Sequence, residues 1–177
     1  MNPNFKHRGR KDIYFPCFLF AILSLFSTTI KIFAQVKSGS HGEVTPTILF
    51  VCEHGAARST IAAAYFDKMA AELGLKYKAQ FRGTDPDATL TPGTAKGLTA
   101  DGFDVMGWKP LKVSPADVTA AAQVVTFDCT LPFESRLDKS IYQWNGIPPI
   151  SSSYPIARDE IKKRVEALIL ELAKNKK

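Results

Sequence analysis

The 177-residue chain has few of the residues that build metal centres, and no long apolar run. It contains three histidines and three cysteines. The histidines, at positions 7, 41 and 54, show none of the spacings typical of zinc ligands, so we expect neither a metal nor another cofactor. No internal repeat or low-complexity tract is present. No apolar run reaches the ~18 residues that predict a membrane-spanning helix.

The N-terminal segment has the layout of a secretory signal peptide. Four basic residues within the first eleven precede an apolar stretch at 15–26, which is short for a membrane span. Ala34, after Ile32-Phe33 and before Gln35, offers a small residue at which the leader is predicted to be cleaved. We therefore predict a signal peptide over residues 1–34 and an exported protein, periplasmic or secreted. An uncleaved membrane anchor is the alternative, because further apolar residues follow the stretch, but Lys31 interrupts them.

Most of the basic character of the chain belongs to this leader. The whole chain has a formal net charge of +6; residues 1–34 hold five Lys/Arg and one Asp, so the remainder carries +2. No stripe of Lys and Arg interleaved with aromatic residues remains, so we expect no nucleic-acid partner, and membrane contact only through the export signal. Residues 35–44 are predicted to be a flexible lead-in, and residues 45–177 one domain of ordinary size.

Strand and helix signals alternate along that domain. Strands are predicted at Pro46–Val51, Tyr77–Arg82 and Ala122–Phe127, and helices at Arg58–Leu73, Gly93–Asp101, Pro115–Ala120 and Ile156–Ala173. The first and third strands are apolar on both faces, as strands inside a parallel sheet covered by helices are. The pattern predicts a single α/β doubly wound domain, in which ligands bind beyond the carboxyl ends of the strands.

The segment from Ile48 to Thr60 carries the chemistry. An apolar strand leads into Cys52, five residues follow, and Arg58 and Ser59 begin an Ala-rich helix. A cysteine at the mouth of such a loop faces unpaired backbone N–H groups and the positive end of the helix dipole, which favour the thiolate. The same N–H groups would hold a tetrahedral oxyanion, with Arg58 on two of its oxygens. This phosphate loop, residues 52–58, predicts thiol-based phosphoryl or arsenyl chemistry; a structural cysteine beside a solvated arginine is the alternative.

The strand, loop and helix resemble the low-molecular-weight protein tyrosine phosphatases and the thioredoxin-coupled arsenate reductases that share their fold. Those proteins open with an apolar strand and a Cys-x5-Arg-Ser loop. The likeness continues through Phe81–Thr84, Pro92–Phe103, Gln123–Asp128 and Ala157–Ile161. It covers about residues 45–172, and it implies that fold with a phosphate loop after the first strand.

The resemblance gives each residue of the phosphate loop a role. Cys52 would be the nucleophile, Arg58 would bind the equatorial oxygens of the substrate, and Ser59 would donate its hydroxyl to the cysteine sulfur. An ordinary early-helix serine is the alternative for Ser59. The remaining loop residues would bind the substrate through backbone N–H groups: Glu53, His54, Gly55, Ala56 and Ala57.

The chain departs from the family pattern at three places. Gly55 stands where the family has an Asn that braces the loop; glycine can adopt the left-handed backbone there but has no side chain to brace with. Glu53 and His54 either tune the thiolate or only shape the rim. The family's general acid is an Asp before Pro in a late loop, but Trp144–Pro149 contains no Asp. Asp128 is the candidate acid, and a helix or turn cap is its alternative.

A second cysteine supports another interpretation. Cys17 leaves with the leader, so Cys52 and Cys129 remain. In an arsenate reductase of this fold, Cys52 would attack arsenate and Cys129, the candidate redox partner, would then attack Cys52 and release arsenite, with a thiol reductant restoring both. A disulfide that inactivates the exported protein, or a buried structural Cys129, are further alternatives. We predict a phosphatase acting on phosphotyrosine or another phosphomonoester. The alternatives are an arsenate reductase and a catalytically weak oxyanion-binding module.

Overall fold

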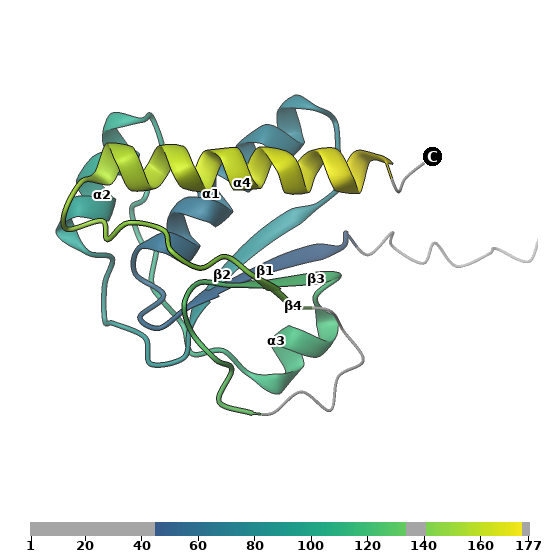
Figure 1. Ribbon diagram of the computed structural model, residues 1–177, viewed down its shortest axis with the longest axis horizontal. Helices are drawn as coiled ribbons and strands as arrows, with labels where there is room; N and C mark the ends of the chain where they lie inside the picture. The colour runs from purple at the N-terminus through teal and green to yellow at the C-terminus, as the bar shows by residue number, and fades with distance from the viewer. Residues whose placement is uncertain (1–44, 134–140, 175–177) are drawn as a thin grey trace, which may run out of the picture. The chain divides into compact units, whose positions relative to one another are not determined.

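The computed structural model describes residues 45–133 and 141–174, which form a parallel sheet flanked by helices (Figure 1). The predicted signal peptide and lead-in lie outside the described residues, so export stays a prediction. Within the described ranges, no helix combines the length and the apolar character needed to cross a membrane.

The sheet has four strands in the order β2-β1-β3-β4, and all neighbouring pairs are parallel. Their bounds are Thr47–Cys52 for β1, Lys78–Gly83 for β2, Gln123–Thr126 for β3 and Ile141–Gln143 for β4. The two central strands, β1 and β3, are the apolar ones, as predicted. Strand β4 was not predicted, because three residues, none of them buried, are too few to show a period.

Helices cover both faces of this sheet. Their bounds are Arg58–Glu72 for α1, Pro92–Ala100 for α2, Pro115–Ala120 for α3 and Tyr154–Lys174 for α4. Buried residues of α1, α2 and α4 share one apolar cluster, whereas Val118 of α3 belongs to a second cluster. Figure 1 shows α1 and α4 on one side of the strands and α3 on the other. The predicted doubly wound α/β fold is confirmed.

The side chains of β1 alternate between the two clusters. Ile48, Phe50 and Cys52 belong to the cluster under α1 and α4, while Leu49 and Val51 belong to the cluster under α3. Strand residues point alternately to opposite faces of a sheet. The alternation therefore directs Cys52, the last residue of β1, toward the face that α1 covers.

A cluster around Asp101 joins three helices beside the sheet. Tyr65 of α1 and Tyr154 of α4 donate hydrogen bonds of 2.7 and 2.6 Å to one oxygen of Asp101, and Arg158 Nη1 donates one of 3.0 Å to the other. Burial by itself would raise the pKa of the Asp101 carboxyl, but the bonds from Tyr154, Tyr65 and Arg158 outweigh it and lower that pKa below its usual range. The charged carboxylate therefore fixes the start of α4.

We expect Asp101→Asn to lower the free energy of unfolding at neutral pH by roughly 1–3 kcal/mol, because a charge-assisted network loses its anion. Since the pKa of Asp101 is lower in the folded state, its contribution is present above the usual carboxyl pKa of ~4 and is lost as the pH falls through the lowered folded value. Urea unfolding of both proteins across this range measures the difference. A difference that does not shrink on acidification would contradict the assignment.

Candidate active site

The sulfur of Cys52 lies at the carboxyl end of β1, against the first turn of α1. Cys52 is 4% exposed, and its Sγ is 3.1 Å from the hydroxyl oxygen of Ser59, which is fully buried. The Ser59 hydroxyl is close enough to donate a hydrogen bond to the sulfur. Such a donor stabilises a thiolate in a site from which water is largely excluded. The predicted neighbourhood of Cys52 and Ser59 is therefore present in the structure.

The phosphate loop is attached to the segment after β2 through its carbonyl groups and not through its N–H groups. The carbonyls of Cys52, Glu53, His54 and Ala56 accept hydrogen bonds of 2.8–3.1 Å from N–H groups within residues 84–91. Within the part of the chain that the structure describes, no N–H group of residues 53–57 donates a hydrogen bond to another backbone group. Loops with their carbonyls occupied and their N–H groups free are suited to bind an anion.

Backbone contacts supply the brace that the Gly55 side chain lacks. Gly55 has a φ of 63°, the left-handed conformation expected for it. A Cβ atom on Gly55 would lie 2.8 Å from the Gly83 nitrogen, and one on Gly83 would lie 2.9 Å from the Glu53 oxygen. The hydroxyl of Thr60 also donates a hydrogen bond of 2.7 Å to the Gly55 carbonyl. The loop is thus seated directly on the end of β2.

Arg58 begins α1, and its guanidinium pairs with the carboxylate of Asp128. Arg58 Nη1 donates to Asp128 Oδ2, and the other carboxylate oxygen accepts a 3.0 Å hydrogen bond from the Gly146 N–H. Asp128 itself has a φ of 45°. The sequence suggested that Asp128 belonged to the site, but not that it contacts Arg58, because the two residues are 70 positions apart.

Glu53 and His54 lie on the rim of the loop. Their side chains are 66% and 54% exposed. The Nδ1 of His54 is 3.3 Å from the Asp85 carbonyl oxygen and 3.6 Å from the Asp87 carboxylate. These contacts point the imidazole toward the segment after β2, which agrees with a rim role.

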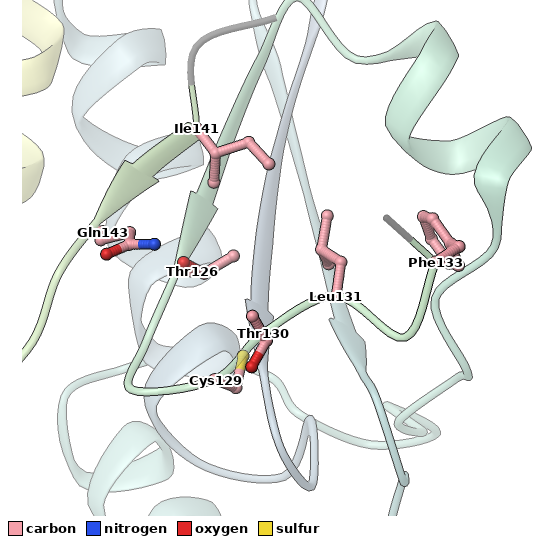
Figure 2. Close-up of a pocket in the computed structure, with 7 residues that line it drawn as sticks. All are labelled: Thr126, Cys129, Thr130, Leu131, Phe133, Ile141 and Gln143. Carbon is pink, nitrogen blue, oxygen red and sulfur yellow. The ribbon is translucent and has the colours of Figure 1, made fainter. Parts of the chain in front are cut away.

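Cys129 follows the end of β3 and packs against the cluster under α3, whereas Cys52 belongs to the cluster under α1 and α4. The Cys129 Sγ donates a 3.5 Å hydrogen bond to the carbonyl of Val51, the residue before Cys52. Burial raises the pKa of the Cys129 thiol, so it holds less of the nucleophilic thiolate at neutral pH. Figure 2 shows Cys129 among the residues that line a cavity. The volume of that cavity is about 350 Å³, and neither Cys52 nor Arg58 is among its lining residues. The other lining residues are Thr126, Thr130, Leu131, Phe133, Ile141 and Gln143.

A second cavity, of about 400 Å³, adjoins Arg58. Its walls come from the phosphate loop, from the start of α2 and from the segment before α4: Ala57, Arg58, Thr91, Pro92, Gly93, Pro149, Ile150 and Ser151. Arg58 is the one charged residue among them. Trp144 is not among these lining residues. Its ring packs against the core, 5.8 Å from that of Phe50 and 5.5 Å from that of Phe127.

Residues 47–132 match the family model described as low molecular weight phosphotyrosine protein phosphatase. The matched region belongs to this family. No curated protein matches the chain. The predicted resemblance is therefore confirmed, and the family's members include both phosphatases and arsenate reductases. The roles of the individual phosphate-loop residues stay predictions.

Solved structures share the fold of this domain. They include a thioredoxin-dependent arsenate reductase from Corynebacterium glutamicum, with a TM-score of 0.62 and 22% identity over 74% of this chain and 63% of that chain. The match thus spans less than two thirds of that reductase. A low molecular weight protein tyrosine phosphatase from T. tengcongensis has a TM-score of 0.63 and 18% identity, over 71% of this chain and 99% of its own. An arsenate reductase from Archaeoglobus fulgidus has a TM-score of 0.55 and 25% identity, over 69% and 98%.

Gly83→Ala should disrupt the phosphate loop, because the new methyl group would lie 2.9 Å from loop backbone atoms that cannot rotate away. We expect a destabilisation of roughly 1–3 kcal/mol, as overpacking typically costs, and a loss of inorganic phosphate binding. Gly93→Ala is the matched control, since its methyl group would lie 3.7 Å from the Ile150 side chain, an ordinary contact. Thermal unfolding and titration calorimetry measure both effects. Unchanged phosphate binding in Gly83→Ala would refute the packing argument.

Proposed function

We propose that the protein is a cysteine-dependent phosphatase that acts through a cysteinyl-phosphate intermediate. The observation that carries the proposal is the placement of the Cys52 sulfur 3.1 Å from the Ser59 hydroxyl, within the loop whose free N–H groups and Arg58 would hold a phosphate. A nucleophile and an anion cradle built on one loop are what in-line phosphoryl transfer requires.

The reaction would take two displacements at phosphorus. The Cys52 thiolate attacks in line, the S–P bond forms, and the bond to the leaving oxygen breaks with its electron pair on that oxygen. Water then attacks the cysteinyl-phosphate, releasing inorganic phosphate and returning the electron pair to sulfur. Arg58 and the loop N–H groups stabilise the equatorial oxygens in both steps, and the Ser59 hydroxyl stabilises the departing thiolate in the second.

The proposed substrate is an aryl phosphomonoester whose ring carries no cationic group and which leaves as a phenolate. The segment Trp144–Pro149 offers no carboxylic acid, and the carboxylate of Asp128 is already paired with Arg58. Without a general acid, rates fall most for poor leaving groups, by about 10²–10⁴-fold. The cavity beside Arg58 has apolar walls at Pro92, Pro149 and Ile150, and no carboxylate to hold a cationic group. Phosphotyrosine and simple aryl phosphates suit these features.

The arsenate reductase alternative draws support from the named structural relatives. It requires the Cys129 thiolate to attack the sulfur of Cys52. Cys129 instead packs against the cluster under α3, and its thiol donates a hydrogen bond to the Val51 carbonyl. Burial also raises the pKa of this thiol. These features favour the phosphatase. If the protein is exported as proposed, a thiol reductant would also be needed to keep Cys52 reduced in an oxidising compartment.

The reduced protein should hydrolyse aryl phosphates, and Cys52→Ser should abolish turnover while leaving phosphate binding detectable. Because the segment Trp144–Pro149 supplies no acid, rates across phenols of increasing pKa should fall steeply. Cys129→Ser should keep the wild-type rate, since it takes no part in phosphoryl transfer. A steady-state series of substituted phenyl phosphates, with thiol-dependent arsenate reduction assayed in parallel, tests these expectations.

Two outcomes would contradict the phosphatase proposal. Arsenate reduction that needs Cys129, without aryl phosphate turnover, would assign the reductase activity. Tight phosphate binding with neither activity would assign an oxyanion-binding module. A shallow dependence on phenol pKa would instead show that an acid is present and has been overlooked.

A further inference from the structure

Asp128 connects the phosphate loop to the segment after β4. Its two carboxylate oxygens are divided between them: Oδ2 accepts from Arg58 Nη1, and Oδ1 accepts from the Gly146 N–H at 3.0 Å. Asp128 also has the one positive φ among the non-glycine residues that the structure describes. Such a conformation is unfavourable for most L-residues and persists where the surrounding contacts fix it. The backbone is thus held in a form that aims this carboxylate between two partners.

Both ends of this connection are firmly anchored. Phe127, just before Asp128, donates a 2.9 Å hydrogen bond to the Val51 carbonyl, beside Cys52. Trp144, just before the Gly146 segment, donates a 2.8 Å hydrogen bond to the Thr126 carbonyl and packs its ring against that of Phe127. The carboxylate therefore occupies a place fixed by the ends of β1, β3 and β4.

We infer that Asp128 is a positioning residue for Arg58, and not the general acid. A guanidinium carries five N–H donors in one rigid plane, so a bond at Nη1 fixes the orientation of the whole group. Nε and Nη2 then form a free edge that can bind two oxygens of a phosphate. Both carboxylate oxygens of Asp128 already accept a hydrogen bond, one from Arg58 and one from Gly146, so neither is directed at the leaving oxygen of a substrate.

Asp128 has two opposing effects on the affinity for phosphate. As an acceptor, Asp128 orients Arg58 and strengthens binding. As an anion, it partly neutralises Arg58 and repels a bound dianion, which weakens binding. A variant that keeps an acceptor but loses the charge should therefore bind phosphate as tightly as the wild type or more tightly. A variant that loses both should bind more weakly.

Asp128→Asn and Asp128→Gly separate these effects. Asparagine tolerates a positive φ and keeps one carbonyl oxygen for Arg58; glycine accepts the same backbone but removes the side chain. Asp87→Asn is the control for charge alone, because Asp87 is a rim carboxylate near His54 that makes no contact with Arg58 in the structure. Thermal unfolding of each variant is measured first, and Asp128→Ser replaces the glycine variant if that variant does not fold.

Binding of inorganic phosphate, measured by calorimetry on the reduced protein, is the first readout. We expect Asp128→Asn to bind within about threefold of the wild type or more tightly, and Asp128→Gly to bind about tenfold more weakly. Equal affinities of the two variants would overturn the inference. This readout needs no turnover, so it decides the role of Asp128 even if the proposed phosphatase activity fails.

Aryl phosphate kinetics, which rest on the proposed function, are the second readout. For a positioning residue, Asp128→Gly raises KM more than it lowers kcat, and the dependence of rate on phenol pKa is the same in all three proteins. A general acid would behave differently: both variants would lose the same activity, most severely with poor leaving groups. That second pattern would contradict our assignment and restore Asp128 as the acid.

Discussion

The site depends on the contact between two stretches of backbone, the phosphate loop and the end of β2. Gly55 and Gly83 approach so closely that neither position has room for a Cβ atom. The carbonyls of the loop are bonded to the segment that follows β2. This arrangement leaves the opposite side of the loop, with its N–H groups, open to an anion. It also places the helix start that carries Arg58 and Ser59 beside the Cys52 sulfur. Each chemical property of the site follows from that backbone geometry.

The sequence was sufficient to predict the fold and the loop, because both rest on local patterns. The apolar runs of β1 and β3 and the periodic faces of α1 and α4 identify those elements over several turns or residues. Strand β4 has three residues and gave no such signal. The contact between Gly55 and Gly83 and the pair between Arg58 and Asp128 also escaped prediction. They join residues far apart in the chain, and a single sequence does not show which distant residues meet.

Two features set this chain apart from the pattern of the family that it resembles. The segment Trp144–Pro149, where the resemblance leads one to expect an Asp before Pro, contains no acidic residue and so supplies no proton donor for the leaving group. Asp128, the carboxylate that the sequence suggested as a substitute acid, is paired with Arg58 instead. In the proposed phosphatase, the loop N–H groups and Arg58 would hold the phosphate and Cys52 would attack it, while the segment Trp144–Pro149 would offer no acid for the leaving alcohol. Such a site would favour activated aryl esters and would depend strongly on the orientation of Arg58.

The covalent intermediate is the central claim, and trapping it tests that claim most directly. The reduced protein would be mixed with an aryl phosphate, quenched in acid within the first turnovers, and analysed by peptide mass spectrometry. The account predicts a phosphoryl group on the peptide that contains Cys52, absent from Cys52→Ser and still formed in Cys129→Ser. A protein that turns over substrate without any phosphoryl-cysteine, or that carries the group on another residue, would contradict the account.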